Sequence, residues 1–261
     1  MQVSAFSIVF MAISAVISIG LPIFLFIFLY RKYSAKVIPM IVGACAFIIF
    51  AMILEQTVHS IVFRNFALWE KPLLYIIYGT FMAGIFEETA RFFSFTILKR
   101  KYNGVITGLS YGIGHGGIEA VLLAGVSMIS SIVLCIFFNA GNIEIITGSL
   151  QGEASEQINM QINALLTSAP YMFLLSGMER LFAISIQISL SVIVFYSVYC
   201  KGKIWLFPSA ILLHAIIDIP AAAFQVNILK SIFVVETLAA LAAVIVTILA
   251  AVLHRKLKEK L

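Results

Sequence analysis

The chain has 261 residues, of which 62% are hydrophobic and only 11% are charged, and its formal net charge is +5. This proportion of charge is too low to cover the surface of a soluble domain of this length, so the composition indicates an integral membrane protein. Its apolar stretches are continuous rather than alternating, which argues against a membrane β-barrel and predicts an all-α fold. The basic residues fall in short loops, which favours a role in membrane topology over nucleic-acid binding.

Seven stretches are long and apolar enough to cross roughly 30 Å of hydrocarbon as helices. They are 5–29, 38–62, 73–98, 104–138, 167–199, 204–224 and 231–253. The first is too long for the core of a cleaved signal and has no basic segment before it, so it is expected to be a span. The fourth and fifth exceed one bilayer thickness, and Gly125 and Pro170 are the expected break points. The whole chain, 1–261, is predicted to form a single transmembrane domain.

Lysine and arginine are distributed unevenly among the loops. Twelve of the seventeen follow the first, third and fifth stretches or lie in the C-terminal tail: Arg31, Lys32, Lys36, Lys99, Arg100, Lys101, Lys201, Lys203, Arg255, Lys256, Lys258 and Lys260. Because cytoplasmic loops are enriched in basic residues, we predict a multi-pass protein of the cell membrane. Its N-terminus is expected outside and its C-terminus in the cytoplasm. The acidic segment 139–166 has Ile158, Ile162 and Leu165 at a spacing that predicts a short amphipathic helix.

Several ionisable side chains lie inside the predicted spans, where exposure to lipid would cost several kcal/mol each. They are Glu87, Glu88, Arg91, His115, Glu119, Glu179, Arg180, His214 and Asp218. Glu87, His115 and His214 each lie about ten residues from the basic end of their span, which is roughly 15 Å along a helix. Three separate helices are therefore expected to bring a glutamate and two histidines to one layer of the bundle.

The spacing around these residues suggests how they pair. Glu119 and Asp218 each follow a histidine by four residues, so each lies on the same helix face as that histidine. A carboxylate in this position can fix the imidazole tautomer and leave the other ring nitrogen for water, a metal or an oxyanion. Glu87 and Glu88 point about 100° apart, so one can face a cavity while the other pairs with Arg91.

Glycines recur through the fourth stretch. Gly104, Gly108, Gly112 and Gly116 are spaced by four residues and predict a smooth stripe that admits a neighbouring helix. Gly114 and Gly117 lie beside His115 and would leave room for a ligand or a substrate backbone.

Three motifs, in this order, resemble those of the CAAX-protease and bacteriocin-processing superfamily of intramembrane proteases. They are Glu87-Glu88-Thr-Ala-Arg91, Tyr111-Gly-Ile-Gly-His115 and His214-Ala-Ile-Ile-Asp218. The string from Gly114 to Glu119, with the later pair Glu179-Arg180, is most similar to the YhfC family of intramembrane metalloproteases. Arg91 stands four residues after Glu87, as in the PrsW-like branch, and not five as in the prenyl-protein branch. Tyr111 replaces the more usual phenylalanine.

The resemblance implies an intramembrane endopeptidase with a cavity on the cytoplasmic side. Water in that cavity would be activated by Glu87 or Glu88, while His115 and His214 polarise it or stabilise the oxyanion. The resemblance assigns the catalytic role to Glu87, whereas the i,i+4 spacing favours Glu87 as the partner of Arg91, so either glutamate can be the base. Supporting roles are expected for Arg91, Glu119, Asp218, Glu179 and Arg180.

The cofactor is left open by these residues. Glu87, His115 and His214 would suffice as ligands of a catalytic zinc, with water in the fourth position. However, the familiar helical zinc motif carries both histidines on one helix. A double glutamate supplies a base without an ion, so we favour the metal-independent mechanism.

The expected partners are the lipid bilayer and a membrane protein or peptide substrate, without nucleic acid. Two other functions suit buried Glu–His–Asp groups: a proton-coupled transporter and a peptide-binding pseudoprotease. Transporters often contain repeated halves with broken helices, and the sequence contains no such repeat.

Overall fold

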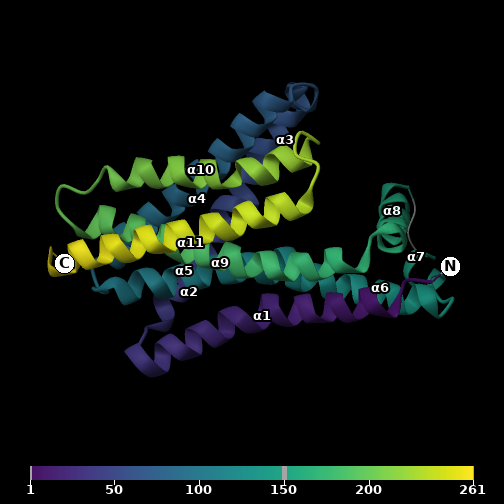
Figure 1. Cartoon of the computed structure of the whole chain (residues 1–261), viewed down its shortest axis with the longest axis horizontal. Coiled ribbons are helices and arrows are strands. Elements are labelled where there is room, and N and C mark those ends of the chain that lie inside the picture. Colours follow the sequence, from purple (N-terminus) through teal and green to yellow (C-terminus); the bar gives the residue numbers. More distant parts are fainter. Residues whose placement is uncertain (1, 149–151, 261) are drawn as a thin grey trace. The chain divides into compact units, whose positions relative to one another are not determined.

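The computed structural model describes residues 2–148 and 152–260, and in these residues it contains helices and no strands (Figure 1). The all-α prediction is confirmed. The helices are α1 (Ala5–Tyr33), α2 (Val37–Phe47), α3 (Gln56–Asn65), α4 (Pro72–Leu98), α5 (Val105–Ala120), α6 (Ser127–Asn139), α7 (Glu144–Thr147), α8 (Glu153–Thr167), α9 (Pro170–Tyr199), α10 (Leu206–Gln225) and α11 (Ile232–Leu257). The π-helical segments η1 (Ile48–Glu55) and η3 (Val121–Val126) join α2 to α3 and α5 to α6. Short 3₁₀ turns form η2 (Leu68–Glu70) and η4 (Lys258–Lys260).

Six helical segments of the described chain are long and apolar enough to cross a membrane. They are Ala5–Tyr33, Val37–Asn65, Val105–Asn139, Pro170–Tyr199, Leu206–Gln225 and Ile232–Leu257. The remaining predicted span, 73–98, is α4, whose 27 residues extend about 40 Å. It is long enough to span, but Glu87, Glu88 and Arg91 lower its apolar character. The prediction of about seven spans is therefore matched approximately.

The two expected break points behave differently. Gly125 lies in η3, where the helix continues but its hydrogen bonds change from the i+4 to the i+5 pattern. Pro170 is the first residue of α9 and does not bend a helix, because the first turn needs no backbone N–H from that position. The predicted amphipathic helix is α8, with Ile162 and Leu165 on its buried side.

The described chain forms two compact units, and each has its own core. The first unit comprises Met1–Leu21 and Ala120–Leu181, and its core includes Met11, Leu134 and Cys135. The second comprises Pro22–Glu119 and Phe182–Leu261. Its largest core cluster gathers aromatic and aliphatic side chains from α4, α5, α9, α10 and α11, among them Phe95, Tyr111, Leu190, Phe195 and Tyr196. In this unit α4 packs mainly on α10, and also on α2 and η1.

The glycine stripe of α5 permits close packing against α9, as predicted. A Cβ atom at Gly112 would lie 2.6 Å from Ile188 Cα, and one at Gly116 would lie 2.7 Å from Gln187 Cβ. Both distances are shorter than real Cβ contacts, so the two helices need glycine there. Gly104 is not part of this contact, because it precedes α5 with a φ of +85° and has open space around it.

Gly114 and Gly117 do not leave room for a ligand, and that prediction is wrong. Gly114 lies directly against the backbone of Met40 in α2. A Cβ atom at Gly117 would lie 2.7 Å from Pro22 Cβ in α1. Neighbouring helices fill both positions, so these glycines serve packing in the second unit.

Candidate active site

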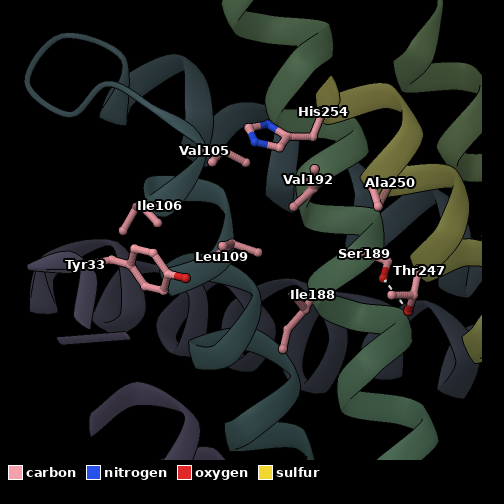
Figure 2. A pocket seen from close by; sticks show the side chains of 11 residues that line it. Tyr33, Val105, Ile106, Leu109, Ile188, Ser189, Val192, Thr247, Ala250 and His254 are labelled. Atoms are coloured by element: carbon pink, nitrogen blue, oxygen red, sulfur yellow. Dashed lines mark hydrogen bonds between the residues drawn. The ribbon is translucent and has the colours of Figure 1, made fainter. Parts of the chain in front are cut away.

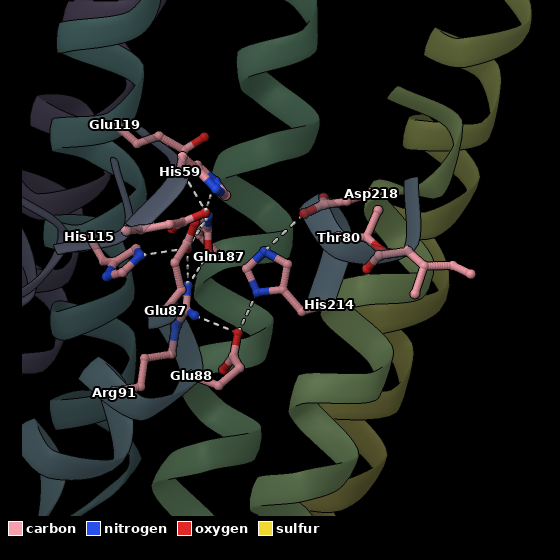
Figure 3. A network of polar contacts seen from close by, with 12 residues as sticks. His59, Thr80, Glu87, Glu88, Arg91, His115, Glu119, Gln187, His214 and Asp218 are labelled. Carbon is pink, nitrogen blue, oxygen red and sulfur yellow. Dashed lines mark hydrogen bonds and ion pairs between the residues drawn. The ribbon is translucent and has the colours of Figure 1, made fainter. Parts of the chain in front are cut away.

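Four helices of the second unit contribute polar side chains to one network (Figure 3). The contributors from α4 and α5 are Glu87, Glu88, Arg91, His115 and Glu119, and those from α9 and α10 are Gln187, Ser191, His214 and Asp218. The three residues expected at one depth, Glu87, His115 and His214, all belong to it. Hydrogen bonds and ion pairs connect them through Arg91 and Glu88.

Arg91 is completely buried and donates to four side chains. Its Nη1 lies 2.5 Å from Glu88 Oε1, and its Nη2 lies 3.5 Å from Glu87 Oε2. Nε lies 3.2 Å from Ser191 Oγ, and Nη2 also donates to Gln187 Oε1. The i,i+4 spacing pointed to Glu87 as the partner, but the guanidinium lies closer to Glu88, one residue nearer on the helix. Arg91 thus balances both carboxylates at once.

Glu87 receives three donors at one carboxylate oxygen. Its Oε2 lies 2.9 Å from His115 Nε2 and 3.0 Å from Gln187 Nε2, in addition to Arg91. The Glu87 side chain is 11% exposed, whereas that of Glu88 is fully enclosed. Because an ionised carboxylate only accepts, His115 carries its proton on Nε2 and keeps a lone pair on Nδ1. In the described residues, this Nδ1 atom is buried and has no hydrogen-bond partner.

His214 lies between two carboxylates. Its Nδ1 is 2.6 Å from Glu88 Oε1, and its Nε2 is 3.4 Å from Asp218 Oδ2. The predicted pairing of His214 with Asp218 is therefore present. For His115, the carboxylate that contacts the ring comes from another helix: it is Glu87 of α4. Glu119 instead accepts from Gln187 Nε2 at 2.6 Å.

Gln187 and Ser191 are the network residues that the sequence did not predict, and Gln187 makes more of the contacts. It is buried in α9 and links Glu87, Glu119 and Arg91. A search for ionisable residues inside spans passes over an amide. The sequence feature that could have identified Gln187 is a polar side chain within an apolar helix, α9, which packs against the glycine stripe of α5.

Glu179 and Arg180 belong to the first unit, where they form an ion pair with each other as neighbours on α9. Arg180 is buried, so the pairing compensates part of its charge. Their expected support of the catalytic residues remains a prediction.

One cavity adjoins the network. It has a volume of about 380 Å³ and is lined from α3, α4 and α10, with Asp218 in its wall. Its other lining residues include Tyr75 in the first turn of α4 and Gln225 at the end of α10. These helix ends lie opposite the basic loops, which the sequence predicts to be cytoplasmic.

A second cavity, of about 360 Å³, is lined by residues of α1, α5, α9 and α11 in the second unit (Figure 2). Its walls are mostly apolar, with Tyr33, His254 and the hydrogen-bonded pair Ser189 and Thr247 as its polar groups. None of the predicted site residues lines it. The cavity beside the network is lined by residues near the opposite ends of these helices, and a cytoplasmic-side cavity around the catalytic residues stays a prediction.

The arrangement does not fit a resident metal ion. Among the described residues, no three His, Cys, Asp or Glu side chains are placed so that they could share one ion. His115 and His214 contact different glutamates, and the Arg91 guanidinium contacts both carboxylates. A cation beside that guanidinium would be repelled. The alternative ligand set of Glu87, His115 and His214 is thus not assembled.

Membrane-length helices around a buried Glu–Arg–His network define a polytopic helical membrane protein with a polar centre. The chain belongs to the YhfC intramembrane metalloprotease family, whose model matches residues 17–239. It is 37% identical over 246 residues to the "Uncharacterized membrane protein YhfC" of Bacillus subtilis (strain 168). That similarity covers 93% of this chain and 94% of the relative. No solved structure matches the chain.

Proposed function

We propose that this chain is an intramembrane endopeptidase in which Glu87 activates the water that attacks a peptide bond. The observation that carries the proposal is the difference between the two adjacent glutamates. Glu88 is enclosed between Arg91 and His214, whereas Glu87 keeps part of its side chain accessible while His115 and Gln187 hold it in place. A base needs both access to water and a fixed orientation, and Glu87 combines them.

The chemical step follows from the carboxylate. Glu87 removes a proton from water as the water oxygen bonds to the carbonyl carbon of the substrate, and the carbonyl electron pair moves to its oxygen. The tetrahedral intermediate then breaks its C–N bond, and the departing amine takes the proton from Glu87. Arg91 keeps the surrounding charge balanced while the proton moves, because it contacts both glutamates.

His214 is the donor we assign to the developing oxyanion. Its contact with Asp218 is long at 3.4 Å, and Asp218 lies in the wall of the neighbouring cavity. His214 Nε2 contacts Asp218 in the cavity wall, so a carbonyl oxygen that displaces this long contact would take its place on Nε2. His115 acts differently, because it positions Glu87 through Nε2.

The proposal is tested in cells that lack the protein and are complemented with wild type, Glu87→Gln or Glu70→Gln. Glu70 is an exposed glutamate outside the network, so it controls for the loss of one carboxylate. New N-termini in the membrane proteome are mapped by mass spectrometry. We expect cleavage products with wild type and Glu70→Gln and none with Glu87→Gln. The same products in all three strains would exclude Glu87 as the base. Products in none of them would support a transporter or a pseudoprotease instead.

A further inference from the structure

The cavity beside Asp218 contains polar groups that the proposed mechanism does not use. It lies at the ends of α4 and α10, and Gln56, His59, Phe63 and Thr80 also line it. His59 is held from both sides, since its Nδ1 is 2.9 Å from Tyr78 Oη and its Nε2 is 3.1 Å from Glu55 Oε1. The imidazole therefore forms a fixed part of the wall, with a buried carboxylate behind it.

The charged residue in the cavity wall is acidic. No lysine or arginine is among the described residues that line it, and Asp218 is its one carboxylate. The Asp218 side chain is 36% exposed, so it can reach a ligand from the wall. Gln56 and Gln225 add amide oxygens, and Gln225 Oε1 already accepts from Tyr75 Oη at 2.7 Å. Such a wall attracts a cation and disfavours an anion.

Aromatic rings complete the wall. Phe63 and Tyr75 line the cavity with ring centroids 5.9 Å apart, and Trp69 lies 4.6 Å from the Tyr75 ring. Aromatic faces attract ammonium and guanidinium groups, and they also pack on the methylene groups of a long basic side chain. An acid, amide oxygens and aromatic rings around one cavity are complementary to an organic cation.

We propose that this cavity binds a lysine or arginine side chain of the substrate, close to the bond that is cleaved. The inference rests on the proposed function, because the cavity adjoins the reacting groups through Asp218, which contacts His214. Asp218 pairs with the cation, Phe63 and Tyr75 hold its methylene groups, and the substrate carbonyl is left beside His214. The protein then cleaves next to basic residues.

Trp69 serves as a reporter of binding. In a Trp205→Phe background it is the remaining tryptophan, since the chain contains two. The purified full chain in detergent is titrated with N-acetyl-lysine amide and with N-acetyl-norleucine amide, which has an apolar side chain and no charge. We expect a saturable change in Trp69 fluorescence with the lysine probe and none with the norleucine probe. An equal response to both probes, or to neither, would overturn the inference.

Two lysine substitutions make a matched pair. Gln56→Lys places an ammonium group in the cavity and should weaken binding of the lysine probe about tenfold by repulsion. Thr57→Lys adds the same charge at the next residue, which is exposed and does not line the cavity, and should bind as the parent does. Equal binding by these two variants would contradict the inference. Asp218→Asn should lose the response, and Gln56→Lys keeps the test decisive if that variant does not fold.

Binding and catalysis are separated by Glu87→Gln in the same background. This variant should bind the lysine probe as the parent does, because Glu87 does not line the cavity. A failure of the proposed function would appear as missing cleavage with binding intact. A failure of the further inference would appear as cleavage products with no Lys or Arg enriched at any fixed position near the new termini.

Discussion

Arg91 has no exposed surface, so its charge depends entirely on its neighbours. Glu87 and Glu88 supply two carboxylates, and Gln187 and Ser191 accept from the remaining N–H groups. Removing one partner from a buried ion pair leaves an uncompensated charge, which costs about 3–5 kcal/mol. The stability of this centre is therefore expected to depend on Arg91 more than on either histidine.

Thermal unfolding in detergent can separate a structural role from a chemical one. Arg91→Ala should lower the stability by about 3–5 kcal/mol, because two buried carboxylates lose their counter-charge. His214→Ala should remain folded and lose activity, since Glu88 keeps its contact with Arg91. Arg64→Ala, at an exposed position of α3, is the control and should change neither property. If His214→Ala unfolds as readily as Arg91→Ala, His214 is structural.

Gln187 provides a test of positioning. Gln187→Leu removes the amide that donates to Glu87 and Glu119, and hydrogen bonds to charged groups contribute about 1.5–3 kcal/mol. We expect kcat to fall by about 10- to 150-fold with little change in KM, because the orientation of Glu87 is lost while the cavity remains. Gln161→Leu, an exposed amide of α8, is the control. A change confined to KM would place Gln187 in substrate binding.

For single residues, the sequence predicted which ionisable side chains lie together, but it did not predict every hydrogen-bond partner. The His214 and Asp218 pairing follows from helix geometry alone, because both lie on α10. The partner of His115 comes from a different helix, and its identity depends on how α4 and α5 pack. Gln187 carries no charge, so the argument from lipid exposure did not select it.

The packing of α5 on α9 sets the distance between Glu87, His115 and Gln187. Gly112→Ala should destabilise the protein and reduce activity, since its Cβ would lie 2.6 Å from Ile188 Cα. Gly20→Ala in α1 is the matched control, because nothing lies within 4 Å of its added Cβ. It should be neutral or stabilising by about 0.5–1 kcal/mol, the ordinary helix preference for alanine. Equal effects in both variants would show that the glycine stripe does not control this packing.

The lengths of the helices were predictable because apolar length and membrane thickness determine them. The details within them depend on packing that no single segment specifies. The π-helical turns η1 and η3 have no marker in composition, and Pro170 suits a helix start as well as a kink. The cavity beside Asp218 likewise depends on where α3 meets α4 and α10.

For the whole molecule, the positive-inside rule predicts an external N-terminus and a cytoplasmic C-terminus. A reporter fused after residue 261 should therefore be active on the cytoplasmic side. A second fusion in the acidic segment 139–166 should be active on the opposite side, because that segment contains no lysine or arginine. A C-terminal reporter that is active outside would contradict the predicted topology.

The central claim is that Glu87, and no bound metal, activates the water. It is tested most directly with purified protein and a substrate identified from the mapped N-termini. Metal content is measured, and cleavage is followed before and after exhaustive chelation, with Glu87→Gln as the inactive reference. We predict that cleavage survives chelation without stoichiometric metal and is absent in Glu87→Gln. Stoichiometric zinc, with activity lost on its removal and restored on its return, would contradict the account.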